Sequence, residues 1–220
     1  MARHYLHANP MMTILPALTF GFVLGVKHAT DADHIAAIGT LSGGAGSSTH
    51  AARLGAMWGV GHSVSVLLVG GALVLLRLPM PARLALALEF AVALMLIVLG
   101  VRSLRRRPAE SPSSLRPFLV GVVHGLAGSA VLALLLVTTA TSAAAATVYL
   151  LCFGIGTVAG MAAVTTLLAL PARLRPTRAL AFEGALRTTA GVASIAIGVW
   201  LAHKIGVRDG LFAATARWEP

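Results

Sequence analysis

The chain has 220 residues, of which 57% are hydrophobic and only 11% are charged, and its mean hydropathy is +0.86. This balance lies far from that of a soluble domain and indicates a polytopic membrane protein. The formal charge of +10 does not indicate nucleic-acid binding, because the arginines stand in short stretches between apolar runs and form no basic reading module. Cys152 is the single cysteine, which excludes an intramolecular disulfide and favours a packing role for this residue.

The N-terminal sequence MARHYLHANP, followed by an apolar run of 14 residues, has the layout of a signal peptide. The run ends in Gly25, Val26 and Lys27 and offers no small-x-small cleavage pattern, so we expect the segment to be kept. Fourteen residues of helix rise only about 21 Å, against a hydrocarbon core of about 30 Å. The first membrane segment must therefore continue through the charged residues that follow.

Six apolar segments are long enough to cross a bilayer at about 20 residues per helix. They comprise residues 13–41, 52–77, 83–104, 117–139, 145–170 and 185–206. Connections rich in glycine, proline or arginine separate them, and the longest, RRRPAESPSSLRP, follows the third segment. The sequence therefore predicts an all-α polytopic membrane protein of six transmembrane helices in a single domain.

Lysine and arginine are distributed unequally between the two sides of this topology. The side of the N-terminus carries six, namely Arg3, Arg77, Arg83, Lys204, Arg208 and Arg217. The other side carries ten, namely Arg53, Arg102, Arg105, Arg106, Arg107, Arg116, Arg173, Arg175, Arg178 and Arg187. Because positively charged loops stay in the cytoplasm, we expect both termini outside and the three arginine-bearing loops inside.

The two halves of the chain resemble each other. FVLGVKH at 22–28 and FLVGVVH at 118–124 share the pattern F-x-x-G-V-x-H at an offset of 96 residues. WGVGHS from residue 58 matches FGIGTV at an offset of 95, and LGV from residue 99 matches IGV at an offset of 98. Three helices per copy is an odd number, so the second copy would be inverted, as in many transporters. The predicted units are 1–105, a cytoplasmic linker 106–116, 117–206 and a tail 207–220.

KHATDADHIAAI, at 27–38, places five ionisable side chains within eight positions of the first segment. Such residues cost a few kcal/mol inside a bilayer, so they normally face a cavity or one another and mark a pathway. The alternative is a frayed helix end at the membrane interface. Because the apolar run IAAIGTL continues beyond the charges, we favour a functional site.

The chemistry open to this cluster is limited by the residues present. Imidazole and carboxylate without thiolate suit divalent first-row metals such as nickel, cobalt or zinc. The chain lacks H-E-x-x-H, G-x-x-x-x-G-K-[ST] and G-x-S-x-G, which argues against a metalloprotease, an ATP-driven pump and a serine hydrolase. We therefore expect a protein without enzymatic activity or resident cofactor that holds a cation inside the membrane.

KHATDADHIAAIGT, at 27–40, is similar to the signature of the nickel/cobalt transporter family, in which a membrane helix carries His, four residues, Asp and His. The resemblance maps this motif onto His28, Asp33 and His34. Asp31 completes the D-A-D element of the same signature. The resemblance implies that these side chains line the route of a divalent nickel or cobalt ion.

GVGHSVSV, at 59–66, resembles the second motif of the family and adds His62. His62 follows two glycines that permit close helix approach, so a hydrogen bond across a helix contact is the alternative to a metal role, which we favour. The stretch HGLAGSAVLALLL, beginning at His124, resembles the short urease-accessory and hydrogenase-accessory nickel permeases more than the eight-helix members of the family. His124 occupies the repeat position of His28, and its role is left open between ligand and structural residue.

The remaining titratable residues are weaker candidates. Glu89 lies inside the third segment and could relay ions, but it stands only about two turns from the Arg83 end, so we favour a structural role. His4 and His7 in the N-terminal tail could collect metal, but two histidines among ten tail residues are weak evidence for this role. His50 and His203 lie near helix ends, where we expect them to be solvated.

The resemblance implies a short six-helix inner-membrane permease for divalent nickel, with cobalt as a further substrate. The expected metal-contacting residues are His28, Asp31, Asp33, His34 and His62, with His124 as the sixth candidate. Uptake without ATP is the expected activity, and efflux or delivery of nickel to a metalloenzyme-maturation partner are the alternatives. The expected partners are the cation and the lipid bilayer, with homo-oligomers left open and nucleic acid excluded.

The geometry of the signature depends on whether its helix is continuous. On a regular helix, His28, Asp31 and His34 form one polar stripe, and Asp33 lies on the other side. Because no proline or glycine interrupts 26–38 and its alanines favour helix, we predict an unbroken helix. Asp33 would then contact a neighbouring helix or orient a ligand. Unwinding just before Asp33, as in the broken helices of transporters, is the alternative.

Overall fold

The computed structural model describes residues 10–42, 47–76, 78, 80–105, 115–139, 142–174 and 179–218. Every regular element in these ranges is a helix, which confirms the predicted all-α class. The helices are α1 (Pro10–His28), α2 (Ala32–Ser42), α3 (Ser48–Ser65), η1 (Val66–Gly70), α4 (Gly71–Leu75), α5 (Ala82–Arg105), α6 (Leu115–Thr139), α7 (Ala143–Leu174), α8 (Ala179–His203) and η3 (Lys204–Arg208). The signal-like start at 1–9 and most of the predicted linker 106–116 lie outside the described residues.

Four of the described helical stretches are long and apolar enough to cross a membrane. They are Ser48–Leu75, Ala82–Arg105, Ala143–Pro171 and Ala179–Arg208. The first of them runs without a turn from α3 through the π-helical η1 into α4, and the last joins α8 to the π-helical η3. Leu115–Gly128 of α6 is a shorter apolar helix. These lengths are those of a multi-pass membrane protein.

The predicted first segment, 13–41, is not one helix. α1 ends at His28, and α2 begins only at Ala32. The prediction of a regular helix through 26–38 is therefore wrong, and the alternative of a local unwinding holds.

Short-range hydrogen bonds explain why the helix stops. The backbone N–H of Thr30 donates to the Lys27 carbonyl at 2.9 Å, and that of Asp31 donates to the His28 carbonyl at 3.1 Å. The Thr30 hydroxyl also donates to the Lys27 carbonyl, at 2.6 Å. These i to i+3 bonds tighten the last turn, as at many helix ends. The Asp31 carbonyl then accepts from Ile35 N at 3.0 Å, so α2 starts on a new axis.

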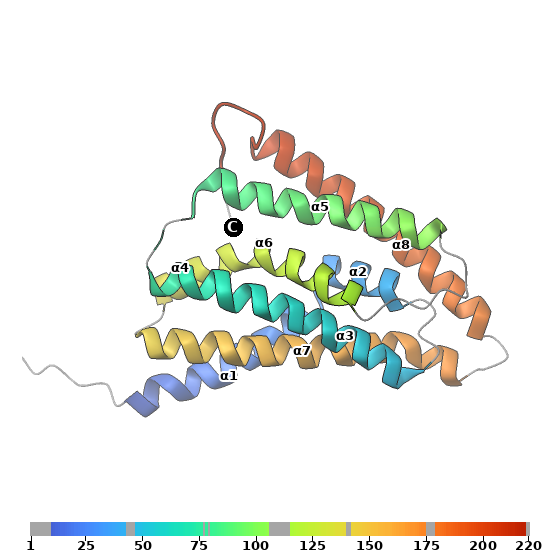
Figure 1. Cartoon of the computed structure of the whole chain (residues 1–220), viewed down its shortest axis with the longest axis horizontal. Coiled ribbons are helices and arrows are strands. Elements are labelled where there is room, and N and C mark those ends of the chain that lie inside the picture. Colours follow the sequence, from blue (N-terminus) through green and yellow to red (C-terminus); the bar gives the residue numbers. More distant parts are fainter. Residues whose placement is uncertain are drawn as a thin grey trace, which may run out of the picture.

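The helices form three groups in Figure 1. α5 lies along α8 on one side, and α7 lies between α1 and α3 on the other. α6 and the short α2 lie between these groups, with α6 packed on α3 and α5 and α2 packed on α8, α5 and α7. The break after α1 therefore places α2 in the middle of the bundle.

Two glycines bring α1 and α7 into near backbone contact. A Cβ atom on Gly25 of α1 would overlap the carbonyl oxygen of Phe153 on α7. In the same contact, a Cβ atom on Gly156 of α7 would overlap the carbonyl oxygen of Phe22 on α1. Only glycine fits at such crossings, where backbones rather than side chains pack together.

The contact between α3 and α6 repeats this arrangement. Here Gly121 of α6 faces the carbonyl oxygen of Trp58, and Gly61 of α3 faces that of Phe118. Gly121 of α6 lies 96 positions after Gly25 of α1, and Gly156 of α7 lies 95 positions after Gly61 of α3. These are the offsets at which the two halves of the sequence match. The two contacts therefore correspond residue by residue.

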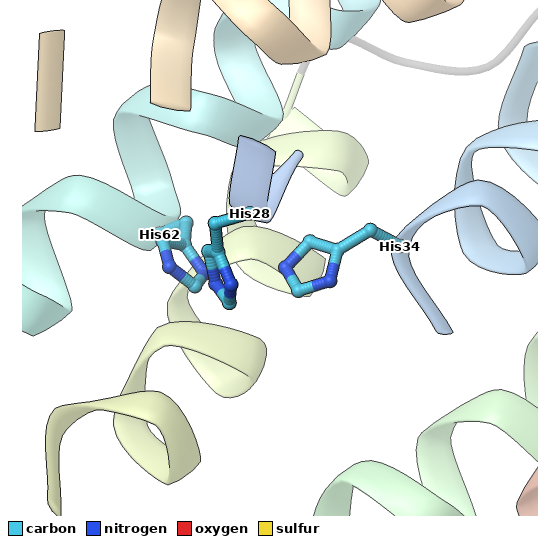
Figure 2. Close-up of side chains that lie close together, drawn as sticks. All are labelled: His28, His34 and His62. Atoms are coloured by element: carbon cyan, nitrogen blue, oxygen red, sulfur yellow. The ribbon is translucent and has the colours of Figure 1, made fainter. Parts of the chain in front are cut away.

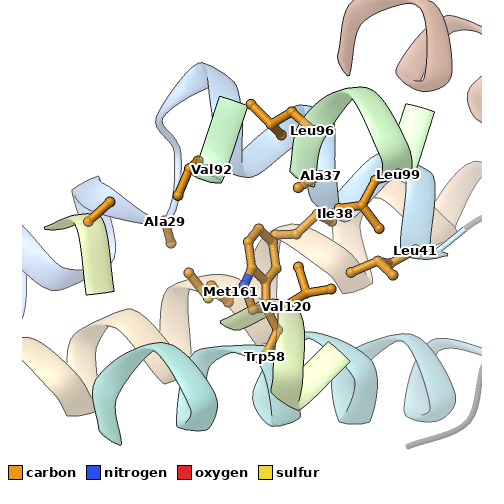
Figure 3. Packing of buried hydrophobic residues seen from close by; sticks show 11 residues of the cluster. Ala29, Ala37, Ile38, Leu41, Trp58, Val92, Leu96, Leu99, Val120 and Met161 are labelled. Carbon is orange, nitrogen blue, oxygen red and sulfur yellow. The ribbon is translucent and has the colours of Figure 1, made fainter. Parts of the chain in front are cut away.

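The largest buried apolar cluster surrounds Trp58 of α3, whose side chain is fully buried (Figure 3). Its members come from α2, α5, α6 and α7 and include Ile38, Leu41, Leu96, Leu99, Val120 and Met161. Ile38 and Leu41 belong to α2, so the cluster anchors this short helix from one face. The Trp58 ring also stacks on His34, with ring centroids 5.5 Å apart.

Candidate metal site

The six side chains predicted to contact metal lie together where α1, α2, α3 and α6 meet. His28 ends α1 and Asp31 follows it, Asp33 and His34 lie in the first turn of α2, His62 lies on α3 and His124 on α6. The His28 and His34 ring centroids are 4.4 Å apart, and those of His28 and His62 are 5.1 Å apart. Figure 2 shows the rings of His28, His34 and His62 directed toward one another from three different helices.

Two carboxylates fix the orientation of two of these imidazoles. Nδ1 of His28 donates to Asp31 Oδ2 at 2.9 Å, and Nδ1 of His34 donates to Asp33 Oδ1 at 3.0 Å. Because a carboxylate only accepts hydrogen bonds, each Nδ1 carries the proton and each Nε2 keeps its lone pair. Both Nε2 atoms are buried and have no hydrogen-bond partner among the described residues. This is the arrangement in which carboxylates prepare histidines to bind metal.

His62 is fully buried, and neither of its ring nitrogens has a hydrogen-bond partner in the described part of the chain. Buried polar groups are almost always paired, so an unpaired imidazole needs a reason. The alternative role of a hydrogen bond across a helix contact belongs instead to the neighbouring serines. Ser63 Oγ donates to the Gly154 carbonyl of α7 at 3.0 Å, and Ser65 Oγ donates to the Val122 carbonyl of α6 at 2.9 Å. These bonds hold the face of α3 that carries His62 toward the other imidazoles.

His28, His34 and His62 form what we call the three-imidazole group. One ligand atom from each lies within 4.8 Å of the others. Imidazole nitrogens bind divalent zinc at about 2.0–2.1 Å, so two of them on one ion stand up to about 4.2 Å apart. Small side-chain rotations are therefore enough to bring all three nitrogens onto a single ion of this size.

Asp33, His34 and His124 form a second set, which we call the carboxylate group. Asp33 Oδ1 accepts from His34 and Asp33 Oδ2 accepts from Nε2 of His124 at 2.9 Å, so one carboxylate joins α2 to α6. His34 and His124 are 1% and 4% exposed, which keeps both rings away from solvent and lipid. His34 belongs to both groups and therefore links them.

A cavity of about 210 Å³ opens beside the two groups. Its polar lining consists of His28, Asp33, His34, Glu89 and His124, and its apolar lining comes from Val92, Ala127, Leu201 and Ile205. Glu89 of α5 was expected to be structural, yet its side chain lines the same cavity as the histidines. The sequence signal for a functional role of Glu89 was the free-energy cost of placing a carboxylate inside a membrane segment.

Comparison with known proteins agrees with this geometry. The profile of NicO, described as high-affinity nickel-transport protein, matches residues 14–106. The urease accessory protein UreH of Bacillus sp. (strain TB-90) is 32% identical over 219 residues, which cover 90% of this chain and 96% of UreH. The chain belongs to the NicO family. No solved structure matches it.

Membership of the NicO family confirms the resemblance inferred from the signature, including its short urease-accessory type. The matched residues 14–106 contain five of the six predicted metal-contacting residues. His124 lies beyond the end of this match, in the half of the NicO chain where the sequence left its role open.

The histidines that were not predicted to contact metal do not contribute to the two groups in the described part of this NicO chain. His203 is exposed at the end of α8, as expected. His50 is half-buried at the start of α3 rather than solvated, and its Nε2 atom is buried. His4 and His7 lie outside the described residues. Within the described ranges, only the histidines of the two groups gather with carboxylates in a way that could hold an ion.

Proposed function

We propose that this chain carries divalent nickel across the cell inner membrane, in the direction of uptake and without ATP hydrolysis or any catalytic step. The observation that carries the proposal is the three-imidazole group, whose buried lone pairs have no hydrogen-bond partner among the described residues. Within a family of nickel-transport proteins, an unpaired set of this kind is best explained by the cation that it binds. Cobalt is the second substrate, because imidazole binds both ions and the affinity order places them side by side.

The shared residue His34 makes the two groups alternative positions for one cation. A neutral imidazole has one lone pair. With its Nδ1 proton donated to Asp33, His34 offers Nε2 to the three-imidazole group. To bind a cation together with Asp33 and His124, it must release Nδ1 and carry the proton on Nε2. The ion therefore occupies the groups in turn, and such consecutive positions are what conduction requires.

The proposed topology has six spans, with α1 and α2 together as a broken first span. Three observations support an inverted repeat of 1–105 and 117–206. The glycine contacts of α1 with α7 and of α6 with α3 correspond residue by residue. His28 and His124 hold equivalent positions and both contact the α2 residues. A broken helix at a repeat interface is also where transporters bind their substrates.

The driving force follows from the charge of the ion. A dication that moves down a potential of 100 mV gains about 4.6 kcal/mol, twice the value for a single charge. This gain suffices for uptake against a concentration ratio of about a thousandfold, since each tenfold step costs about 1.4 kcal/mol. With both termini outside, as the arginine distribution suggests, the cavity beside the site faces the external end of α5.

Accumulation of radioactive nickel in cells that express the chain tests the proposal, with cobalt, zinc and manganese as competitors. We expect uptake that cobalt suppresses and manganese does not. His34→Ala should lower uptake at least about 100-fold, because it removes a metal ligand from both the three-imidazole group and the carboxylate group. His203→Ala, at an exposed histidine of α8, is the matched control and should behave as wild type. The absence of metal movement in either direction would overturn the proposal, and net loss of preloaded nickel would replace uptake by efflux.

The name of the relative UreH, a urease accessory protein, favours delivery of nickel to enzyme maturation as the second candidate. The two functions separate in cells whose nickel enzyme depends on this chain. If the chain only transports, excess external nickel restores the enzyme when the chain is deleted. If it delivers nickel directly to a maturation partner, excess nickel leaves the enzyme inactive.

A further inference from the structure

Glu89 is a carboxylate in an otherwise apolar part of the cavity wall. It lies seven residues after the start of α5, about 10 Å along the helix axis. Around it, α5 and α8 contribute Val92, Leu201 and Ile205, while His28, Asp33, His34 and His124 line the same cavity. A cation that leaves or enters the two groups through this cavity must pass the Glu89 side chain.

The charge of Glu89 is not neutralised by a neighbouring cation. Within the described ranges, Glu89 forms no ion pair. Its hydrogen-bond partner is the neutral indole of Trp218, whose Nε1 donates to Glu89 Oε1 at 2.8 Å. A carboxylate in a membrane segment that is not paired with a basic residue attracts cations and is a candidate for an ion pathway.

Trp218 reaches Glu89 because the C-terminal segment turns back after η3 over the start of α5 (Figure 1). Arg83 of α5 donates to the carbonyl oxygens of Ala213 and Ala214 at 3.0 and 2.7 Å. Arg217 N donates to the Asp209 carbonyl at 2.8 Å. The segment is therefore fastened to the helices that form the cavity, and a single hydrogen bond connects it to the carboxylate.

We propose that Glu89 is a further cation-binding residue, which collects the divalent ion in the cavity before the histidines bind it, and that Trp218 competes with the ion for this carboxylate. The proposal rests on the proposed nickel-transport function and adds a third position to the route. The ion displaces the indole N–H from one carboxylate oxygen, and the hydrogen bond re-forms when the ion moves on to Asp33 and His34.

Glu89→Gln separates this role from a structural one. The glutamine oxygen still accepts the Trp218 hydrogen bond, so a purely structural Glu89 predicts no change. Loss of the charge should raise the Kd of purified protein for nickel and the KM of uptake about tenfold, with the thermal unfolding temperature unchanged. Glu89→Asp keeps the charge and should recover most of the affinity. Glu183→Gln, at a carboxylate of α8 that does not line the cavity, is the matched control.

Trp218→Phe tests the competition from the other side. Phenylalanine keeps an aromatic ring on the segment but cannot donate to Glu89, so the carboxylate is free to bind the ion. We expect the Kd and the KM for nickel to fall about tenfold, as expected for the loss of one competing hydrogen bond to a charged carboxylate. Trp200→Phe, at a tryptophan of α8 that is 59% exposed, is the control and should not change either value.

The outcomes distinguish the two proposals. If wild type accumulates nickel and Glu89→Gln matches Glu183→Gln in both Kd and KM, the role of Glu89 is overturned and the transport function stands. If wild type moves no nickel, the transport function falls, and the Kd of the purified variants still decides whether Glu89 binds the ion. A Kd that rises in Trp218→Phe would overturn the competition and make the hydrogen bond a support for binding.

Discussion

α1 and α6 carry the same pattern and make the same helix contact, but they end differently. Each presents F-x-x-G-V-x-H, each packs a glycine against a partner backbone, and each brings its histidine to the cluster. α1 stops at His28, whereas α6 continues through His124 to Thr139. The two helices thus pack in the same way, but ionisable residues follow His28 in the sequence and apolar residues follow His124.

The difference shows what the break contributes. On a continuous helix, His34 would lie six residues after His28, about 9 Å further along the axis. In the structure the two ring centroids are 4.4 Å apart. Only because the chain turns at Ala29–Asp31 can the two imidazoles contact one ion. α6, which does not turn, contributes one histidine to the candidate site, whereas α1, α2 and the turn between them contribute two histidines and two carboxylates.

The largest effect is expected from Gly25→Leu and Gly121→Leu, which test the shared part of the comparison. At both positions a side chain would collide with a backbone carbonyl of the partner helix, which cannot move away. We expect both variants to lose folded protein, as measured by the monodisperse yield in size-exclusion chromatography. Gly184→Leu is the control, because nothing lies within 4 Å of a Cβ atom there. If only one of the two variants misfolds, the contacts are not equivalent.

His28→Ala and His124→Ala test the difference between the two histidines. His28 offers a free Nε2 to the three-imidazole group, so its loss should weaken nickel binding about 100-fold. His124 bonds to Asp33, and its loss affects the carboxylate group, for which we expect a change of about tenfold. Isothermal titration of purified protein with nickel measures both. Equal losses would show that the two repeats contribute equally to one site.

Asp33→Asn and Asp31→Asn sharpen the comparison by altering the carboxylates alone. Asp33 accepts from two imidazoles, and an asparagine has one acceptor oxygen, so one ring must lose its partner. Asp31 accepts from His28 only, and its side chain is 43% exposed. Uptake at limiting nickel should fall about 30-fold for Asp33→Asn and about threefold for Asp31→Asn. A larger loss at Asp31 would indicate that it contacts the ion directly.

Thr30→Ala is expected to have the smallest effect, because it removes one exposed hydrogen bond from the turn. The Thr30 hydroxyl donates to the Lys27 carbonyl at 2.6 Å. Its loss should cost about 1 kcal/mol, which lowers the thermal unfolding temperature by about 2–4 °C. Differential scanning fluorimetry in detergent checks this value. A folded Thr30→Ala variant that binds no nickel would mean that the hydroxyl does more than end the helix.

The residues of the site were predictable, whereas their geometry was not. Charged residues inside a membrane segment are costly, and this cost alone singled out His28, Asp31, Asp33 and His34. The break was missed because the alanines of the segment favour helix. The competing signal was the T-D-A-D run, since threonine and aspartate side chains bond to nearby backbone and favour helix ends. Because the T-D-A-D run lies between two apolar stretches, the whole segment was interpreted as one membrane helix.

Contacts between distant parts of the chain could not be read from local patterns. Glu89 and Trp218 stand 129 positions apart, and nothing in their neighbourhoods predicts that they meet. The same holds for His124 and Asp33, which are 91 positions apart. The weak repeat gave the relation of His28 to His124, but the hydrogen bond of His124 to Asp33 depends on how α2 turns into the bundle.

The break between α1 and α2 also creates two helix ends within the helix bundle, and each end carries part of a charge. Aligned peptide dipoles give a helix about half a negative charge at its C-terminus and half a positive charge at its N-terminus. The C-terminus of α1 lies at His28, where partial negative charge favours a dication. The N-terminus of α2 lies beside Asp33, where the partial positive charge favours a carboxylate. A continuous helix would offer neither end, so at the proposed site the peptide backbone itself would help to hold a cation.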